Sequence, residues 1–294
     1  MTILVTGGTG YIGREFIKKY QNDFDIISLV RATSDIEYLK SLNCKIKRFD
    51  NFRNINNVFQ ENKIIGVVHF ASNVLVEHEE SDLCHLIDSN INYGTYLLEL
   101  SKQNGVKWFL NTGTFWQNYQ NKDYNPVNFY AATKEAFEKI AMYYTQTSDI
   151  IFTTIKLNDT FGPNDTRPKI FNLWDKYSRL DETLDMSEGE QIIDISYIDD
   201  VVSAFKVMIN NLQSENSKLY NNRSYVVSSK QRMTLKELAN LFKKVTNRNL
   251  NINWGARAYR NREVMIPLES SQLVPGWEQM YTLEEAIIKT IGEN

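Results

Sequence analysis

Residues 3–13 have the sequence ILVTGGTGYIG, in which a short apolar run ends in a glycine-rich turn. Apolar residues then recur at helical spacing from Ile12 to Tyr20. A strand, a glycine turn and a helix in this order suit a bound diphosphate, because glycines let the backbone approach and the first N–H groups of the helix face the anion. The spacing Gly7-x-x-Gly10-x-x-Gly13 differs from the commonest dinucleotide fingerprint, G-x-G-x-x-G. A turn that needs glycine only for its dihedral angles is the alternative.

The composition is that of an ordinary soluble globular protein. The chain has 294 residues, of which 42% are hydrophobic and 23% charged, enough for one large α/β unit or two lobes. The net charge of -3 gives no reason to expect nucleic acid or an anionic membrane as a partner, and no apolar stretch approaches the ~20 residues of a membrane span. The first strand begins at residue 3 with no basic leader, so we expect a cytoplasmic protein.

Cysteine and histidine are too few or too scattered to predict a disulfide framework or a metal centre. Cys44 and Cys84 are expected to be reduced thiols. His69 lies within an apolar run and is expected to be a hydrogen-bonded core residue. His78 and His85 are seven residues apart, a spacing that is weak for zinc, so we predict no metal site.

Strands and helices alternate through the first half of the chain. Strands are predicted over residues 25–30, 44–49, 64–73 and 107–112, with helices over 52–62 and 86–102. Asn92 is expected either to make a contact near the sheet or to be exposed. Right-handed βαβ units in this order form a doubly wound parallel sheet, whose ligand crevice lies outside the carboxyl ends of the strands. Five residues of functional type fall at such ends: Gly7, Arg31, Asp50, Asn73 and Thr112.

The tip of the strand over residues 25–30 indicates which dinucleotide to expect. An acid there binds the ribose hydroxyls, whereas an arginine pairs with a 2′-phosphate. The tip here is Arg31, and the next acid is Asp35. This favours NADP(H) over NAD(H), unless Arg31 is merely solvated as most arginines are. Asp50 and Asn51, at the end of the next strand, are placed to bond an adenine edge.

The stretch NFYAATKEAF (residues 128–137) is predicted to begin a long helix. Tyr130 and Lys134 are four residues apart, so both side chains leave the same helix face. Because an ammonium one turn away favours a phenolate, we expect Lys134 to lower the pKa of Tyr130 from ~10. Such a tyrosine can exchange a proton with a carbinol or carbonyl oxygen near neutrality. The Thr112 hydroxyl, on an adjacent strand end, is expected to polarise the same oxygen.

These and further motifs make the chain resemble an extended short-chain dehydrogenase/reductase of the family that modifies nucleotide-activated sugars. The further motifs follow in the family's order along nearly the whole chain: VHFA (68–71), NYGT (92–95), NDTFGP (158–163) and ISYIDDV (195–201). The resemblance implies an α/β fold, with a Rossmann-type nucleotide-binding domain over residues 1–160, to which 191–210 return. It implies a smaller, mainly substrate-binding lobe over residues 161–294.

The resemblance also implies roles for individual residues. Tyr130 resembles the catalytic acid/base, Lys134 the lysine that bonds the nicotinamide ribose, and Thr112 the Ser/Thr of the triad. In the sugar 4,6-dehydratases an acidic pair follows that Ser/Thr, whereas here Gly113-Thr114 follows, so we expect no dehydration. The family's usual Tyr-Gly is replaced by Trp116-Gln117, which implies a different substrate wall.

Residues 111–117 (NTGTFWQ) and 126–134 (PVNFYAATK) are similar to the group of CDP-abequose and CDP-paratose synthases. That resemblance implies NADPH-dependent reduction of the 4-keto group of a CDP-4-keto-3,6-dideoxyhexose, in deoxysugar biosynthesis for a surface polysaccharide such as the O-antigen of lipopolysaccharide. It also implies a homodimer. Two alternatives stay open: an NAD-dependent nucleotide-sugar 4-epimerase and a non-catalytic NADP(H) sensor.

The motifs and the resemblance together predict two sets of binding residues. Trp254 or Tyr259 is expected to pack on the nucleobase or to fill core, and Arg260 is an alternative to Arg257 as a diphosphate ligand. The predicted cofactor site comprises Gly7, Thr9, Gly10, Tyr11, Ile12, Gly13, Arg31, Asp50, Asn51, Phe70, Ala71, Ser72, Asn111, Tyr130, Lys134, Leu157, Asn158 and Thr160. The predicted substrate site comprises Asn73, Thr114, Trp116, Asn158, Arg167, Lys169 and Arg257.

Overall fold

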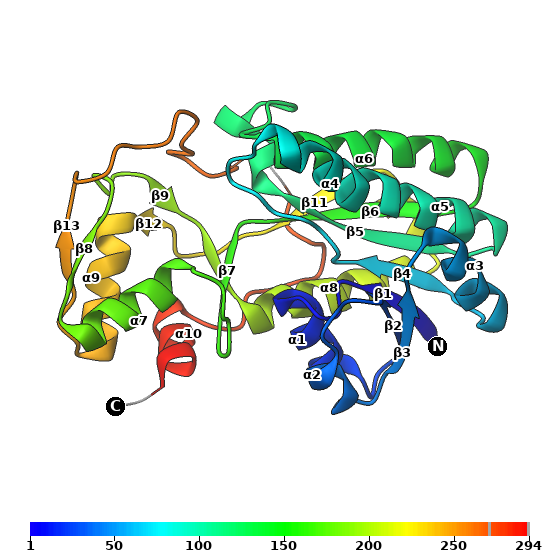
Figure 1. Cartoon of the computed structure of the whole chain (residues 1–294), viewed down its shortest axis with the longest axis horizontal. Helices are drawn as coiled ribbons and strands as arrows, with labels where there is room; N and C mark the ends of the chain where they lie inside the picture. Colours follow the sequence, from blue (N-terminus) through cyan, green and yellow to red (C-terminus); the bar gives the residue numbers. More distant parts are fainter. Residues whose placement is uncertain (270–271, 293–294) are drawn as a thin grey trace.

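A seven-stranded parallel sheet forms the centre of the fold (Figure 1). The computed structural model describes residues 1–269 and 272–292. The strand order is β11-β6-β5-β4-β1-β2-β3, and every neighbouring pair is parallel. The strands are β1 (Thr2–Thr6), β2 (Asp25–Arg31), β3 (Lys45–Phe49), β4 (Gly66–His69), β5 (Trp108–Thr114), β6 (Ile151–Leu157) and β11 (Arg223–Val227). The predicted doubly wound sheet is confirmed, and its strand order reverses between β1 and β4, where such folds hold their ligands.

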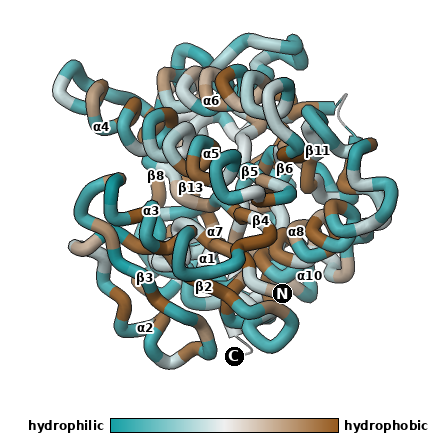
Figure 2. The backbone as a smooth tube through the Cα atoms, turned by 90° about the vertical axis from the view of Figure 1, so that its right-hand side faces the viewer, coloured by the Kyte–Doolittle hydropathy of each residue, from teal (hydrophilic) through white to brown (hydrophobic). Residues whose placement is uncertain are grey.

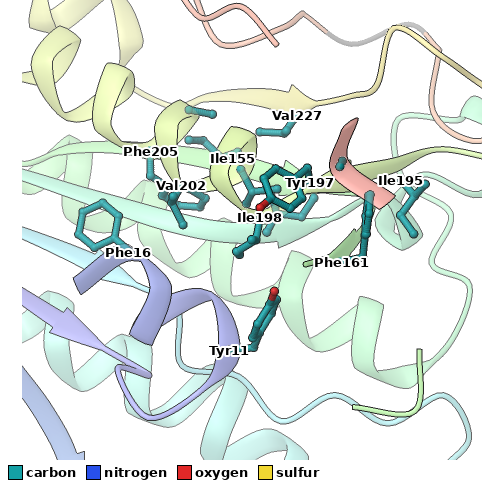
Figure 3. Packing of buried hydrophobic residues seen from close by; sticks show 14 of the residues in the cluster. Tyr11, Phe16, Ile155, Phe161, Ile195, Tyr197, Ile198, Val202, Phe205 and Val227 are labelled. Atoms are coloured by element: carbon teal, nitrogen blue, oxygen red, sulfur yellow. The ribbon is translucent and has the colours of Figure 1, made fainter. Parts of the chain in front are cut away.

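Helices cover both faces of the sheet. They are α1 (Tyr11–Tyr20), α2 (Glu37–Lys40), α3 (Phe52–Glu61), α4 (Leu83–Ile87), α5 (Tyr93–Gln103), α6 (Phe129–Thr147) and α8 (Ile198–Leu212). On one face Leu110 belongs to a core with Phe16 of α1 and Phe205 of α8; Figure 3 shows both phenylalanines in that core. Its neighbour Phe109 belongs to a second core with Phe137 of α6. Successive strand residues therefore supply two separate cores, as the alternation of side chains along a strand requires.

The smaller lobe is built from the carboxyl-terminal half of the chain (Figure 1, left). Its helices are α7 (Ile170–Leu180), α9 (Leu235–Thr246) and α10 (Leu283–Ile291). Three two-stranded sheets complete it: β7 (Asp159–Phe161) with β10 (Ile195–Tyr197), β9 (Ile192–Ile193) with β12 (Met233–Thr234), and β8 (Thr183–Asp185) with β13 (Asn251–Asn253). Thr234 and Glu237 form the capping box predicted for α9. The core beneath α1 and α8 continues into this lobe through Phe161, Phe171 and Phe242.

The lobes differ from the predicted division in one element. Residues 223–227 were assigned to the smaller lobe, but as β11 they pair with β6 at the edge of the main sheet. Strand β6 was not predicted, because buried polar residues such as Thr153, Thr154 and Lys156 interrupt its apolar pattern. The helix predicted over 86–102 contains a π-helical turn, η2 (Asp88–Asn92), between α4 and α5.

Hydropathy follows the layers of the fold. Figure 2 shows brown, hydrophobic residues on the central strand β4 and along α8, and teal, hydrophilic residues on most outer loops. Within the described ranges, no helix has both the length and the apolar character that a membrane span requires. The remaining short 3-10 helices are η1 (Glu80–Asp82), η3 (Phe115–Gln117), η4 (Tyr119–Asn121) and η5 (Ser217–Tyr220).

Candidate active site

The glycine turn between β1 and α1 is packed too tightly for any side chain. Gly7 has a φ of 70°, and a Cβ there would lie 2.6 Å from the backbone nitrogen of Ala71. A Cβ on Gly13 would lie 2.2 Å from the carbonyl oxygen of Gly7. Gly10 donates its N–H to that same oxygen over 2.9 Å. The turn thus needs glycine for close approach as well as for its dihedral angles, and it leaves the first turn of α1 open to an anion.

A cavity of about 560 Å³ lies at the carboxyl ends of β1, β2, β3 and β4. Its walls also include Thr33, Ser34, Phe52 and Tyr93. The predicted cofactor residues that line it are Gly7, Thr9, Gly10, Arg31, Asp50, Phe70, Ala71 and Ser72, joined by Asn73 from the predicted substrate set. A cavity that begins at the glycine turn and ends at the tips of β2 and β3 fits an elongated dinucleotide.

Other predicted cofactor residues lie outside the walls of this cavity: Tyr11, Ile12, Gly13, Asn51, Asn111, Tyr130, Lys134, Leu157, Asn158 and Thr160. Several of them have structural partners. Asn51 caps α3 by accepting N–H bonds from Arg53 and Asn54. Tyr11 donates its hydroxyl to the carbonyl of Pro163 over 3.2 Å. Their cofactor roles stay predictions.

Tyr130 and Lys134 lie in the first two turns of α6, whose amino terminus is capped by Asn128 accepting the N–H of Ala131. Tyr130 is 8% exposed and Lys134 is 1% exposed. The Lys134 Nζ has no hydrogen-bond partner in the described parts of the chain. A buried amine without a partner suits a bound ribose hydroxyl, so this site fits the nicotinamide half of a dinucleotide.

Burial sets the ionisation of both groups. It lowers the pKa of Lys134 to about 8, although the carboxylate of Glu138 opposes the shift. It raises the pKa of Tyr130 to about 12, against hydrogen bonds from the hydroxyls of Ser72 and Thr114 that lower it. The pKa of Tyr130 is thus raised rather than lowered, because desolvation outweighs the effect of the neighbouring hydroxyls; the effect of Lys134 on it stays a prediction. The phenol is protonated at neutral pH, which is the form that can donate a proton.

Two threonines of β5, Thr112 and Thr114, bear on the predicted triad. The Thr114 hydroxyl is close enough to Tyr130 to lower its pKa, and the buried Oγ1 of Thr112 has no hydrogen-bond partner among the described residues. Thr114 Oγ1 also accepts the N–H of Trp116 over 3.3 Å. Thr114 is therefore a second candidate, beside Thr112, for the hydroxyl that shares an oxygen with Tyr130, and the role of Thr112 stays a prediction.

Asn90, in the π-helical turn, was missed by the sequence analysis. Its Oδ1 accepts from the Ser72 hydroxyl over 3.0 Å and from the Asn73 N–H over 2.8 Å. Its Nδ2 donates to the Asn73 carbonyl and to Thr133 Oγ1. Asn90 therefore fixes the loop after β4 against α6. Asn92, which the sequence analysis considered instead, is exposed and bonds Asp88.

A second cavity, of about 350 Å³, lies between the two lobes beyond Tyr130. The Trp116 ring lies in its wall and meets the Tyr130 ring edge-on, with the centroids 6.3 Å apart. Apolar residues make much of the wall: Val76, Phe115, Trp116, Val127, Phe129, Val264 and Pro267. Its charged residues include Glu77, Asp159, Asp194, Arg260, Arg262 and Glu263, and His78 stacks on Phe129.

The predicted substrate residues other than Trp116 all lie outside this wall. Asn158 donates to Asp194 and to the Val227 carbonyl, and Arg167 is bonded to Asp165 and Thr160. Lys169 pairs with the cavity residue Asp159 over 2.8 Å. Arg257 is exposed outside the cavity. These roles stay predictions.

The cavity cations are Arg260, the alternative considered from the sequence, and Arg262, which was missed. Arg262 is held over the Tyr119 ring, 4.4 Å from its centroid, and donates to Asn125. Trp254 packs against the core, and the Tyr259 hydroxyl accepts the N–H of Glu190. The position of Arg262 depends on residues 119–125, a loop far away in sequence.

No three His, Cys, Asp or Glu side chains gather as metal ligands within residues 1–269 and 272–292. Cys44 and Cys84 are free thiols, as predicted. His69 is buried and shares a hydrogen bond with Thr6 over 2.8 Å, which confirms its predicted place in the core.

Comparison with known proteins adds both family and fold. The model of the NAD dependent epimerase/dehydratase family matches residues 3–222. A CDP-abequose synthase of Yersinia pseudotuberculosis is 29% identical over 276 residues, covering 91% of this chain and 92% of that protein. A CDP-abequose synthase of Salmonella muenchen is 26% identical, covering 99% of this chain and 97% of that protein.

Solved structures show the same architecture. The UDP-glucose 4-epimerase of Thermotoga maritima, solved with UDP-glucose, superposes with a TM-score of 0.84 at 22% identity, covering 99% of this chain and 97% of that one. The UDP-glucose 4-epimerase of Thermus thermophilus, solved with NAD, gives a TM-score of 0.82 at 20% identity, covering 99% and 98%. At these identities the likeness establishes the fold.

Proposed function

The chain belongs to the NAD dependent epimerase/dehydratase family, and we propose that it reduces the 4-keto group of a CDP-4-keto-3,6-dideoxyhexose with NADPH. The family and the fold support an enzyme with a nicotinamide dinucleotide as cofactor. The observation that most supports reduction is the buried Tyr130, which lies one turn from the buried Lys134 on α6 and meets Trp116 of the second cavity edge-on. The similarity to two CDP-abequose synthases supports the choice of sugar.

The proton chemistry follows from the side chains around Tyr130. Bound NADPH supplies the hydride that the carbonyl carbon of the sugar accepts. Tyr130 gives its phenolic proton to the carbonyl oxygen as charge develops there. The ammonium of Lys134, one turn along α6, then stabilises the phenolate in a low-dielectric site. Thr114 can donate to the same oxygen, and one proton from solvent restores the phenol.

The second cavity suits a deoxysugar joined to a diphosphate. One part of its wall is apolar and is made of Val76, Phe115, Trp116, Val127 and Phe129, which offer few partners for hydroxyl groups; the polar residues of the wall lie beside it. A sugar without hydroxyls at C3 and C6 leaves fewer polar groups unpaired against such a wall. Arg260 and Arg262 supply positive charge for the diphosphate. We assign no dehydratase activity, because Gly113-Thr114 on β5 has no carboxylate to remove a proton.

The cofactor is proposed to be NADPH because Arg31 lines the first cavity beside Thr33 and Ser34. Arg31→Ala should raise the Kd for NADPH about tenfold to hundredfold, the effect of losing charge-assisted hydrogen bonds to a phosphate. Binding of NADH should stay unchanged. Titration of both dinucleotides by protein fluorescence measures the two constants. Arg223→Ala, an exposed arginine of β11 at the opposite edge of the sheet, is the matched control. Equal weakening of NADPH and NADH would contradict the assignment.

The reaction is tested with NADPH and a panel of CDP-, UDP- and dTDP-linked 4-keto deoxysugars, together with their 4-hydroxy counterparts. We expect NADPH absorbance to fall in proportion to the CDP-sugar consumed, with a product reduced at C4 by NMR. Conversion of a 4-hydroxy sugar without loss of NADPH would instead establish a 4-epimerase. Tight NADPH binding with no turnover of any sugar would establish a sensor.

The setting of the proposed reaction follows from its substrate. We propose a role in deoxysugar biosynthesis for a surface polysaccharide, in the cytoplasm, where nucleotide sugars and NADPH are both available. We further propose a homodimer and a lobe boundary near residue 160. Size-exclusion chromatography with light scattering measures the oligomeric state.

A further inference from the structure

The side-chain amide of Gln117 is buried and makes three hydrogen bonds. Gln117 is 0% exposed. Its Oε1 accepts the backbone N–H of Thr114 over 2.9 Å. Its Nε2 donates to Glu135 Oε2 over 2.7 Å and to Glu138 Oε1 over 2.9 Å. One side chain thus ties the end of β5 to two carboxylates of α6.

The space for this amide exists because residue 113 is glycine. A Cβ on Gly113 would lie 2.8 Å from Gln117 Oε1. The resemblance described above implies an acid at position 113 in the dehydratases and a glycine at position 117 in the common epimerases, whereas this chain has Gly113 and Gln117. The two departures fit together: the side chain missing at Gly113 makes room for the one added at Gln117.

The carboxylates that Gln117 binds lie next to the lysine of the proposed active site. Lys134 and Glu138 are one turn apart on α6, so their side chains share a face. Glu138 also faces Lys156 of β6 and Glu135, while Glu135 pairs with Lys139 over 3.1 Å. The Ser224 hydroxyl approaches Glu138 Oε2 at 3.4 Å.

We infer that Gln117 is a positioning residue for the proposed reduction: it holds Thr114, at the end of β5, against Glu135 and Glu138 of α6, the helix that carries Tyr130 and Lys134. The inference rests on the function proposed above. Gln117 touches no substrate in this role, and its effect passes through the groups it bonds. The residue is therefore expected to govern the rate of the chemical step and its pH dependence.

The direction of the pH effect follows from the charges. Burial raises the pKa of Glu138, and the Gln117 amide, Lys156 and Lys134 lower it. Without the amide, Glu138 holds its proton to higher pH and no longer supports the ammonium of Lys134, whose pKa of about 8 then falls. His69 is the other titratable group coupled to Lys134, and its pKa is already well below 6.5 because it is buried. Activity that needs charged Lys134 should therefore decline from a lower pH.

The test compares Gln117→Met, which keeps the shape but has no amide, with wild type. We expect kcat to fall about tenfold to hundredfold, KM for NADPH to change less than about twofold, and the alkaline limb of the kcat–pH profile to move to lower pH. Gln103→Met removes a similar amide–carboxylate bond at an exposed site on α5 and should match wild type. Glu138→Gln should move the alkaline limb in the same direction, and the double variant Gln117→Met/Glu138→Gln should move it little further.

The outcomes separate this inference from the function on which it rests. A wild-type protein that turns over no keto sugar contradicts the proposed function. An active wild type together with an unchanged alkaline limb in Gln117→Met contradicts the inference alone. If the lower kcat of Gln117→Met is accounted for by a smaller folded fraction, seen as a lower melting temperature, and the kcat–pH profile is unchanged, then Gln117 has only a packing role and the inference is wrong.

Discussion

Replacing Tyr130 with phenylalanine should lower kcat for keto-sugar reduction by about 10²–10⁴-fold, the range for loss of a general acid. The phenolic oxygen is the proton donor proposed between the two cavities, and the aliphatic hydroxyls of Ser72 and Thr114 are much weaker acids that cannot take over its role. The ring itself remains, so its edge contact with Trp116 and the packing of α6 should persist. The Kd for NADPH should stay within about twofold, because the residues of the first cavity are untouched.

Stopped-flow measurement of single-turnover NADPH oxidation gives the rate of the chemical step in this variant. Tyr143→Phe makes the same change on the same helix, at a side chain that is 57% exposed, and should behave as wild type. A Tyr130→Phe enzyme that retains wild-type turnover would remove Tyr130 from the mechanism.

Gly13→Ala should weaken cofactor binding through crowding alone. Gly13 lies in the first turn of α1, where alanine has no conformational penalty, but its Cβ would lie 2.2 Å from the Gly7 carbonyl and 3.0 Å from the Gly8 Cα. The turn must move away from α1, which costs about 1–3 kcal/mol as for other overpacked sites. The N–H groups that face a diphosphate move with it. Loss of one such bond is worth ~1.5–3 kcal/mol, so the Kd for NADPH should rise about tenfold to hundredfold.

Thermal unfolding and NADPH titration measure the two effects. Gly105→Ala is the matched control, because Gly105 has a φ of 67° and no atom within 4 Å of an added Cβ. That variant should lose ~1–2 kcal/mol through backbone strain and keep its affinity for NADPH. A Gly13→Ala protein that binds NADPH as wild type does would show that the turn is not the diphosphate site.

The local patterns predicted the elements that surround the cofactor cavity. The apolar run near the amino terminus, the glycine spacing and Arg31 at the tip of β2 predicted segments that the structure brings together around the first cavity. These features are short-range, so their physical meaning is contained in a few neighbouring residues. The family of the chain was predicted from the order of its motifs and is confirmed by the match over residues 3–222.

Features that depend on distant partners were missed. In the sequence, the residues of β6 include polar side chains that do not suit a buried strand. In the fold these side chains have hydrogen-bond partners: Thr154 bonds Asn111, and Lys156 bonds Asn118. Arg262 enters the second cavity because Asn125 and Tyr119, more than a hundred residues earlier, hold it. Sequence spacing has no information on such pairs.

The ionisation of the active site was the prediction that failed. Spacing along a helix placed Lys134 beside Tyr130, but it said nothing of the desolvation that raises the pKa of Tyr130 to about 12 and lowers that of Lys134 to about 8. The same limitation affects the threonines. Thr112 and Thr114 are two residues apart on β5 and leave the same side of the strand, so spacing alone does not show which of them has a free hydroxyl; in the structure Thr114 Oγ1 accepts the N–H of Trp116.

The edge strand β11 bears on how the protein is made. The ribosome synthesises β1 to β6 before β11. The outer edge of β6 therefore has no strand partner until residues 223–227 have been synthesised. An unpaired edge of a sheet is a template for pairing with other chains. The residue before β11 also bonds to β6, since Asn222 donates its N–H to the Phe152 carbonyl over 2.7 Å. The nucleotide-binding half therefore cannot complete its own sheet during translation, and it relies on a segment that the ribosome releases some seventy residues after β6.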